Sequence, residues 1–474
     1  MADAVFRTLV PDAPLYRRTE GDVARSDLFA LRERLTNFSL TVEPKRPGLK
    51  QPSLVSTYDG KIKSLLLSLP KFSVTDGDLA PAYQSLIRAL EVGTKFVVVH
   101  HKSHRGEIDK WFADAGHSAN VTYVSLADYV SFTDWAEDSY VSLVDKEDGA
   151  HYLMEPWEFK RSGDALIADA VEEAGVLSAS QAPLIFQGGN CLVGKDHWFL
   201  GRDYFADSVA LLTGQRPPVT IPKDTLAAKF TLDLFKDYVD AERELILLGT
   251  EKPISLRQYV GAKEGSEYIL DIPAEGAGTY QPIFHIDMFV TLAGKRKNEK
   301  FKVLVGDPAL ADEALGTKSS YALAGVYGII AKQIADLGFE VLRNPLVHWP
   351  TKGRKYKLSN LKEIATSSQS EALSRAVAEL TSLGANDATD VTARSWHHIT
   401  WNNCLVEDMD QGSTVYLPTF GYGDKSKLAA LDQHMASLWK GLGFQVKLLG
   451  DFNGFARRQG VVHCIKKYLE RAPS

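Results

Sequence analysis

Short apolar runs alternate with amphipathic stretches along most of the chain. Residues 95–100 (KFVVVH) form one such run, residues 105–115 carry apolar side chains at helical spacing, and residues 121–126 form the next run. Apolar runs of this length are typical of strands, whereas apolar residues that recur every three or four positions predict a helix. This segment therefore predicts a strand, a helix and a second strand.

The same order returns in the second half of the chain. A helical pattern is clearest between Leu428 and Leu442, where apolar residues recur at intervals of 3, 4, 3 and 4. Further elements are expected as a helix at residues 321–337 and as strands at residues 301–305, 340–342, 415–418, 445–449 and 460–465. The repeated order predicts an α/β protein, built either as a doubly wound sheet or as a pseudo-symmetric ring.

The organisation of the chain separates an N-terminal extension from a main body. Residues 1–55 are rich in charge and proline and contain one expected short helix at residues 25–35, so we expect them to pack on a main domain at residues 56–474. No GxGxxG follows a strand and no GxxxxGK[ST] occurs, which makes nucleotide chemistry a poor interpretation.

Composition narrows the class of protein. The 474 residues are 45% hydrophobic and 24% charged, as in ordinary globular proteins, and the net charge of −6 comes without a basic run that would favour nucleic acid. The longest apolar stretch, residues 321–331, is too short to span a bilayer, and the first residues contain no continuous apolar signal segment. We therefore expect a cytoplasmic protein with neither a membrane nor a nucleic-acid partner.

An acidic turn is the first candidate for chemistry. Residues 133–140 (TDWAEDSY) place Asp134, Glu137 and Asp138 around Trp135, directly before an expected strand. Carboxylates form charge-assisted hydrogen bonds and aromatic faces attract cations, so this turn could hold a cation. A solvated acidic loop remains the alternative.

Two further segments suit a pocket. Residues 186–194 (FQGGNCLVG) contain Gly188 and Gly189, which permit close approach to the backbone, although a hairpin turn would explain them equally well. In residues 282–290 (PIFHIDMFV), an extended backbone would project His285 and Asp287 to the same side. This pair predicts an acid or base beside a fixed charge, with a structural pair as the alternative, and two ligands make a metal site a weaker interpretation.

Cysteine chemistry is suggested near the C-terminal end. Cys464 follows His463 in residues 459–465 (QGVVHCI), and neighbours on a strand point to opposite faces, so we expect His285 rather than His463 to serve Cys464. A buried cysteine without chemistry is the alternative. The chain has only three cysteines, and their spacing predicts neither a disulfide framework nor a structural zinc site.

The order of these four segments resembles that of the guanidine-modifying, or pentein, superfamily, most nearly its agmatine deiminase and bacterial peptidylarginine deiminase branch. An acidic turn with Trp, a GGN segment, an HxD segment and a terminal GxxHC recur there in this order, with residues 401–404 (WNNC) and 415–418 (VYLP) similar to a further stretch. The resemblance covers about residues 60–470. It departs at Glu137, where the family usually carries Arg, at Ser139-Tyr140, and at Gln187, where many members carry Glu.

The resemblance implies a fold and a reaction. The fold would be a pentein-type α/β propeller, a pseudo-fivefold ring of ββαβ units with a central site. Cys464 would be the nucleophile toward a guanidinium carbon, Asp138 and Asp287 would hold the guanidinium, and His285 would move protons. Substrate-binding roles are expected for Trp135, Gln187, Gly188, Gly189, Asn190 and Asn403.

The implied activity is hydrolysis of a small or peptidyl guanidine, such as agmatine, arginine or peptidyl-arginine, to a ureido product and ammonia through a covalent thiouronium. No metal and no organic cofactor is expected, and a homo-oligomer is compatible with the sequence. An amidinotransferase would use the same four residues, and a non-catalytic guanidine-binding protein would keep the same scaffold.

Overall fold

The computed structural model describes residues 49–214, 225–254, 259–272, 279–295, 299–317, 323–351 and 353–472. The short helix expected at residues 25–35 and most of the expected extension lie outside these residues. The end of that extension joins the main body, because β1 (Pro52–Leu54) pairs antiparallel with β5 (Val141–Asp145) and Leu54 is buried.

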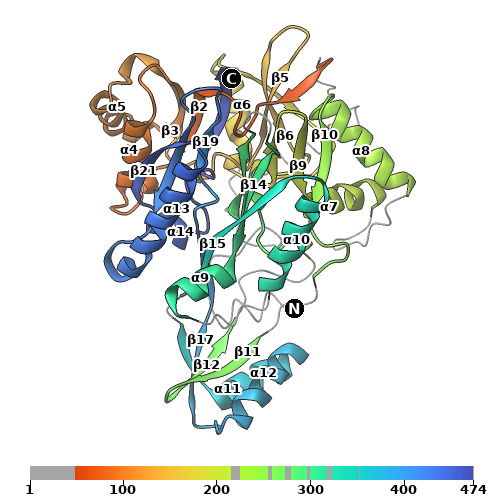
Figure 1. Cartoon of the computed structure of the whole chain (residues 1–474), viewed down its shortest axis with the longest axis vertical. Coiled ribbons are helices and arrows are strands. Elements are labelled where there is room, and N and C mark those ends of the chain that lie inside the picture. The colour runs from red at the N-terminus through yellow and green to blue at the C-terminus, as the bar shows by residue number, and fades with distance from the viewer. Residues whose placement is uncertain are drawn as a thin grey trace.

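Five of the six sheets formed by the described residues follow one plan (Figure 1). In each, an antiparallel pair of strands is followed by a helical crossover to a parallel strand. The antiparallel pairs are β5 with β6, β8 with β9, β13 with β14, β19 with β20 and β22 with β2, and β1 adds a further antiparallel strand beside β5. The expected pseudo-fivefold α/β ring of ββαβ units is confirmed.

The strands and helices of this ring have the following bounds. The strands, sheet by sheet, are β22 (Lys466–Ala472), β2 (Lys61–Leu69), β3 (Lys95–His101), β4 (Val121–Leu126); β1, β5, β6 (His151–Glu155), β7 (Ser178–Gln181); β8 (Cys191–Val193), β9 (His197–Gly201), β10 (Glu244–Leu248); β13 (Val290–Gly294), β14 (Lys302–Asp307), β15 (Glu340–Pro350), β18 (Trp396–Thr400); and β19 (Leu405–Glu407), β20 (Thr414–Thr419), β21 (Gln445–Asp451). The helices are α3 (Lys71–Thr75), α4 (Ala80–Ala89), α5 (Arg105–Asp114), α6 (Ile167–Glu173), α7 (Arg202–Thr213), α8 (Leu226–Tyr238), α9 (Pro308–Leu315), α10 (Ala324–Asp336), α13 (Ala429–Gly441) and α14 (Asn453–Arg457).

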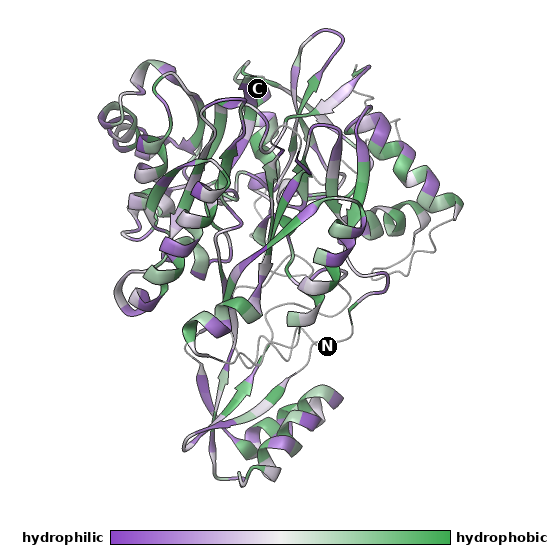
Figure 2. Cartoon of the chain, viewed as in Figure 1, coloured by the Kyte–Doolittle hydropathy of each residue, from purple (hydrophilic) through white to green (hydrophobic). Residues whose placement is uncertain are grey.

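Local sequence explains these elements. Every residue of β2 from Ser64 to Leu69 is buried, as expected for an inner strand that is covered on both faces. Helix α9 begins after Asp307, whose side chain accepts a hydrogen bond from the N–H of Ala309, and ends at Gly316 with φ of 62°. In α13, Leu431 and Met435 of the apolar series are buried, so the predicted helix is confirmed. Figure 2 shows the apolar positions concentrated on the inner strands and on the inner sides of the helices.

The ring closes between segments that lie far apart in the sequence. Strand β22 pairs antiparallel with β2, which is about 400 residues earlier, and so completes the first sheet. Arg471 reinforces this closure, because its guanidinium donates hydrogen bonds to the carbonyl oxygens of Thr57, Gly60 and Val406. The residues just before β22 are therefore held at the centre of the ring.

A separate lobe extends from the ring at the bottom of Figure 1. Its sheet has the order β11 (Val260–Glu264), β12 (Glu267–Asp271), β17 (Asp390–Arg394) and β16 (Arg354–Lys357), and it is covered by α11 (Leu358–Ser367) and α12 (Glu371–Ser382). The lobe has its own hydrophobic core. The sequence patterns above did not anticipate it. None of the helices within the described ranges has the length and apolar character needed to cross a bilayer.

Candidate active site

Residues 460–465 form a turn, so the strand expected there is wrong. The strand β22 begins only at Lys466, and Asn403 organises the turn before it. The Oδ1 atom of Asn403 accepts hydrogen bonds from the backbone N–H groups of His463 at 2.9 Å and Cys464 at 3.2 Å. Because these N–H groups bind a side chain and not a neighbouring strand, the two side chains are not forced to opposite faces. Both of them contact Asp287.

The segment that contains His285 and Asp287 is also not extended as expected. Residues Ile286–Met288 form a short 3₁₀ turn, η5, ahead of β13. The backbone N–H of Ile286 donates to Oδ1 of Asn190 at 2.9 Å, and the same oxygen accepts from Gln281 Nε2 at 2.9 Å. The side chain of Asn190 therefore accepts the backbone hydrogen bond that Ile286 would donate to a neighbouring strand if it lay in a sheet. Asn190 positions the His285 segment, which the sequence did not indicate.

Cys464 lies against Asp287 in the interior. The Sγ atom is 3.7 Å from Oδ2 of Asp287, and Asn403 Nδ2 donates to the sulfur at 3.2 Å. His463 Nδ1 is 2.8 Å from the same Asp287 oxygen. The other carboxylate oxygen, Oδ1, is buried and has no hydrogen-bond partner among the described residues. It is an acceptor available to a bound N–H group.

His285 and Asp138 form the second half of the cluster. Nδ1 of His285 is 3.6 Å from Oδ1 of Asp138, and Nε2 is 2.7 Å from Oε1 of Gln187. The amide oxygen of Gln187 accepts the Nε2 proton, which leaves Nδ1 facing the carboxylate. Gln187 thus orients the imidazole, and its expected contact with a substrate stays a prediction. The four expected catalytic residues thus lie in two contacting pairs, Cys464 with Asp287 and His285 with Asp138.

The acidic turn is buried, so its interpretation as a solvated loop is wrong. Asp134 pairs with Arg458 at 3.1 Å, and Asp138 pairs through Oδ2 with Arg161 at 2.7 Å. Trp135 packs edge-on against Phe455 with ring centroids 6.0 Å apart. Its ring thus packs in the core, and its contact with a substrate cation stays a prediction.

The two glycines before Asn190 are required by close contacts. A Cβ on Gly189 would lie 2.4 Å from His285 Nδ1, and a Cβ on Gly188 would lie 2.0 Å from the carbonyl oxygen of Glu137. Real Cβ atoms do not approach other atoms so closely. The glycines therefore let the GGN turn, η4 (Gly188–Asn190), pack directly on the histidine and on the acidic turn.

This contact gives a first testable prediction. Gly189→Ala should displace the His285 ring and lower turnover at least about tenfold, because misplacing a proton-transfer group removes much of its contribution. Thermal unfolding and ammonia release from a guanidine would be measured together. Gly106→Ala is the control, since a Cβ there meets nothing within 4 Å. Wild-type turnover in Gly189→Ala would contradict the placement of His285.

The electrostatics of the empty site favour the neutral thiol. Burial raises the pKa of Cys464 well above its usual value, and the carboxylates of Asp287 and Asp138 raise it further. Burial lowers the pKa of His463 well below its usual value, so its ring is neutral and its Nδ1–H donates a hydrogen bond to Oδ2 of Asp287. A bound cation beside the carboxylates would offset their effect on the sulfur. This supports the expectation that thiolate forms mainly with substrate present.

The strand geometry expected for His463 is wrong, and its contact with Asp287 gives a second prediction. His463→Ala should lower kcat/KM about 10- to 100-fold, the equivalent of one hydrogen bond to a charged group, because Asp287 loses its donor. Steady-state kinetics with the variant would be compared with Cys404→Ala, a buried substitution that leaves the contact between His463 and Asp287 in place. An unchanged kcat/KM would show that the hydrogen bond from His463 to Asp287 does not contribute to turnover and that His463 only fills space.

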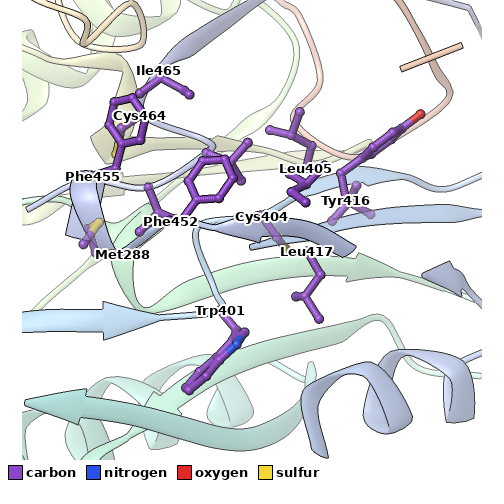
Figure 3. Close-up of a cluster of buried hydrophobic side chains, with 14 of the residues drawn as sticks. Met288, Trp401, Cys404, Leu405, Tyr416, Leu417, Phe452, Phe455, Cys464 and Ile465 are labelled. Atoms are coloured by element: carbon purple, nitrogen blue, oxygen red, sulfur yellow. The ribbon is translucent and has the colours of Figure 1, made fainter. Parts of the chain in front are cut away.

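The remaining cysteines lack the two contacts that Cys464 makes with Asp287 and Asn403. Burial raises the pKa of Cys191 and of Cys404 to about 12 in each case. Figure 3 shows Cys404 within the buried apolar cluster that also holds Trp401 and Leu417, as expected for a core residue. No group of three or more His, Cys, Asp or Glu side chains in the described ranges is arranged to hold a metal ion.

Sequence reasoning missed three cations of this region. Arg161, on the loop before η3 (Asp164–Leu166), binds Asp138, and Lys466 and Lys467 both bind Glu137. A signal for the lysines was present, since Glu137 departs from the usual family residue and two lysines follow Cys464-Ile465 closely. No comparable local signal marks Arg161.

Comparison with known proteins was made by sequence and by structure. No family model matches the chain, and no curated protein matches it. The structure is similar to that of C. jejuni agmatine deiminase, with a TM-score of 0.51 and 14% identity over 89% of this chain and 97% of that one. Enterococcus faecalis agmatine deiminase gives a TM-score of 0.49 and 13% identity over 90% and 99% of the two chains. DDAH from Pseudomonas aeruginosa, in complex with citrulline, gives 0.36 and 10% over 86% and 99%. The structural likeness confirms the pentein-type fold that the motifs predict, and this fold is shared with an agmatine deiminase.

Proposed function

We propose that the protein is a cysteine-dependent hydrolase of a guanidine compound, of the deiminase type. The observation that carries the proposal is the convergence of Cys464, His285 and two buried carboxylates, Asp138 and Asp287, from segments separated by more than 300 residues. A thiol, an imidazole and two acids around one point suit attack on a planar, cationic carbon.

Substrate binding falls to the carboxylates. The unpartnered Oδ1 of Asp287 and the Asp138 carboxylate would accept N–H groups of the guanidinium, each for about 1.5–3 kcal/mol. The positive charge of the substrate then stabilises the Cys464 thiolate. Gly188 and Gly189 keep the pocket wall close to the histidine, and Asn403 fixes the direction of the sulfur.

The reaction follows from these positions. The Cys464 thiol gives its proton to His285, and its sulfur forms a bond to the guanidinium carbon. His285 then passes this proton to the departing nitrogen, and ammonia leaves with the C–N electron pair. Water then attacks the thiouronium carbon, His285 takes a proton from it, and the C–S bond breaks to restore the thiol. The sum is guanidinium plus water to a ureido compound plus ammonium.

A substrate screen tests this proposal. Purified protein would be incubated with agmatine, arginine and an arginine-containing peptide, and ammonia and the ureido product would be measured. We expect both products in equal amounts from at least one guanidine. If a new guanidino compound forms from added glycine, lysine or ornithine and no ammonia is released, the protein is an amidinotransferase and not a hydrolase. No product from any guanidine, with or without amines, would contradict catalysis.

A further inference from the structure

Gln459 has a backbone conformation that residues other than glycine rarely adopt. It directly follows the C-terminal cap of α14 with φ of 69°, and in the described part of the chain only one other non-glycine residue, Gln369, has a positive φ. The N–H of Gln459 donates to the carbonyl oxygen of Ala456 at 2.9 Å, and the N–H of the next residue reaches back to that of Phe455 at 3.4 Å. This pattern ends many helices, and glycine is the usual residue at its left-handed position because it has no Cβ.

The buried side chain of Gln459 explains why a glutamine stands at this position. Its Nε2 atom donates to the carbonyl oxygen of Trp396 at 3.2 Å, and its Oε1 atom accepts from Nδ1 of His398 at 3.1 Å. Since a carbonyl oxygen can only accept, the first bond fixes which end of the amide faces the histidine. Glycine would relieve the backbone but would supply neither bond. The strained conformation is therefore retained together with two hydrogen bonds to β18.

Two amide side chains join the turn that carries Cys464, residues 460–465, to one segment of the chain. Gln459, directly before the turn, binds β18. Asn403, three residues after the end of β18, binds the backbone N–H groups of His463 and Cys464. Strand β18 lies at the edge of its sheet, next to β15. The turn is therefore attached to this edge at its start and near its end.

The acidic turn packs against the same two ends. A Cβ on Gly460 would lie 2.3 Å from Cζ3 of Trp135, so the backbone at the start of the turn lies directly on the indole ring. Near the other end, the carbonyl oxygen of Cys464 accepts from the N–H of Glu137 at 3.1 Å. A shift of Gln459 would displace Gly460 relative to the indole and would move the backbone that leads to the sulfur.

We infer that Gln459 is a positioning residue: its buried amide ties the start of the turn to β18 and thereby keeps the sulfur of Cys464 beside the carboxylate of Asp287. The inference rests on the proposed function for the part that Cys464 plays in the reaction. Gln459 acts through the backbone that leads to Cys464, because its own side-chain hydrogen bonds go to β18.

Gln459→Gly tests the inference in steady-state kinetics, because glycine accepts the left-handed backbone and removes both side-chain hydrogen bonds. The kcat value should fall about 10- to 100-fold, since a displaced nucleophile slows the chemical step. KM should change less than about threefold, because the carboxylates that would hold the guanidinium lie on other segments. The matched control is Gln369→Gly, the same change at the other left-handed glutamine, which is exposed in the lobe. Both kcat and KM should stay at wild-type values in this control.

Alkylation by chloroacetamide tests the position of the sulfur without any substrate. A bond forms between Cys464 Sγ and the methylene carbon, chloride leaves with the C–Cl electron pair, and the thiol proton passes to the buffer. Burial and Asp287 keep the wild-type thiol protonated, so a turn released from β18 should react about tenfold faster at neutral pH, which corresponds to a pKa lower by about one unit. Mass spectrometry would follow each cysteine separately. Cys191 and Cys404, which are also buried, report any general opening of the fold in the same samples.

The alkylation result decides the inference. Faster alkylation of Cys464 alone in Gln459→Gly supports it, and an unchanged rate at Cys464 would overturn it whatever kcat does. Faster alkylation of all three cysteines would also overturn it, since Gln459 would then stabilise the fold as a whole. If Gln459→Gly does not fold, Gln459→Met keeps the volume, removes the same hydrogen bonds and should give the same result. Faster alkylation of Cys464 alone, with no ammonia released from any guanidine by the wild-type protein, would contradict the proposed hydrolase and leave the inference standing.

Discussion

Cys464→Ala should lower guanidine hydrolysis by about a thousandfold or more, to the background of the assay, because no other thiol of the site can form the covalent intermediate. Binding of the guanidine should persist, since the carboxylates that hold it are untouched. Ammonia release would measure the first effect, and calorimetric titration with the substrate found in the screen would measure the second.

The control for this variant is Cys404→Ala, which removes a sulfur from the same hydrophobic core. It should unfold at a somewhat lower temperature and retain turnover, because Cys404 lies among apolar side chains. Full activity in Cys464→Ala would end the proposed mechanism. A similar loss in both variants would show that packing, and not chemistry, accounts for the effect.

Asp287→Asn should have the second largest effect. It should weaken substrate binding and at the same time make the free thiol more reactive. Substrate affinity should fall about 10- to 100-fold, because a charged acceptor for a guanidinium N–H is lost. The free thiol should at the same time become more reactive toward neutral chloroacetamide at neutral pH. Asp287 raises the pKa of Cys464, so its neutralisation lowers that pKa and increases the thiolate fraction.

The sign of the second effect makes the test specific. A carboxylate that acted as a general base for the thiol would give the reverse result, a slower alkylation in Asp287→Asn. The rate of alkylation against pH, together with substrate affinity, distinguishes the two roles. Loss of affinity with unchanged or slower alkylation would contradict the electrostatic role given to Asp287 in the empty site.

The sequence predicted the parts of this molecule that depend on repeated patterns. Apolar periodicity identified helices such as α5 and α13 and the strands around them, since burial of one face imposes that spacing. The order of four short motifs predicted which segments meet. The structure pairs Cys464 with Asp287 and His285 with Asp138, and Asp138 lies near enough to Cys464 to raise its pKa. The lobe between β11 and β17 carries ordinary strand and helix patterns, and nothing local indicates that they fold apart from the ring.

The errors at the site share one physical cause. The apolar residues around HID (residues 285–287) and VVHC (residues 461–464) predict strands. In the structure, however, the side chains of Asn190 and Asn403 accept hydrogen bonds from the backbone N–H groups that a strand would pair. These asparagines lie about 60 to 100 residues away in sequence. Local periodicity cannot reveal a partner so distant, and the position of His463 was therefore misjudged. The pairing of Arg161 with Asp138 was missed for the same reason.

The turn that contains Cys464, residues 460–465, lies where the ring closes, directly before the strand β22 that pairs with β2. A contact between segments about 400 residues apart carries a larger loop-closure cost than contacts within one strand–helix–strand unit, so we expect it to form after them. In partly folded chains, Cys464 would therefore remain exposed to solvent. It would come into contact with Asp287 only when β22 pairs with β2. We therefore expect Cys464 to react as an ordinary exposed thiol in any chain in which β22 has not yet paired with β2.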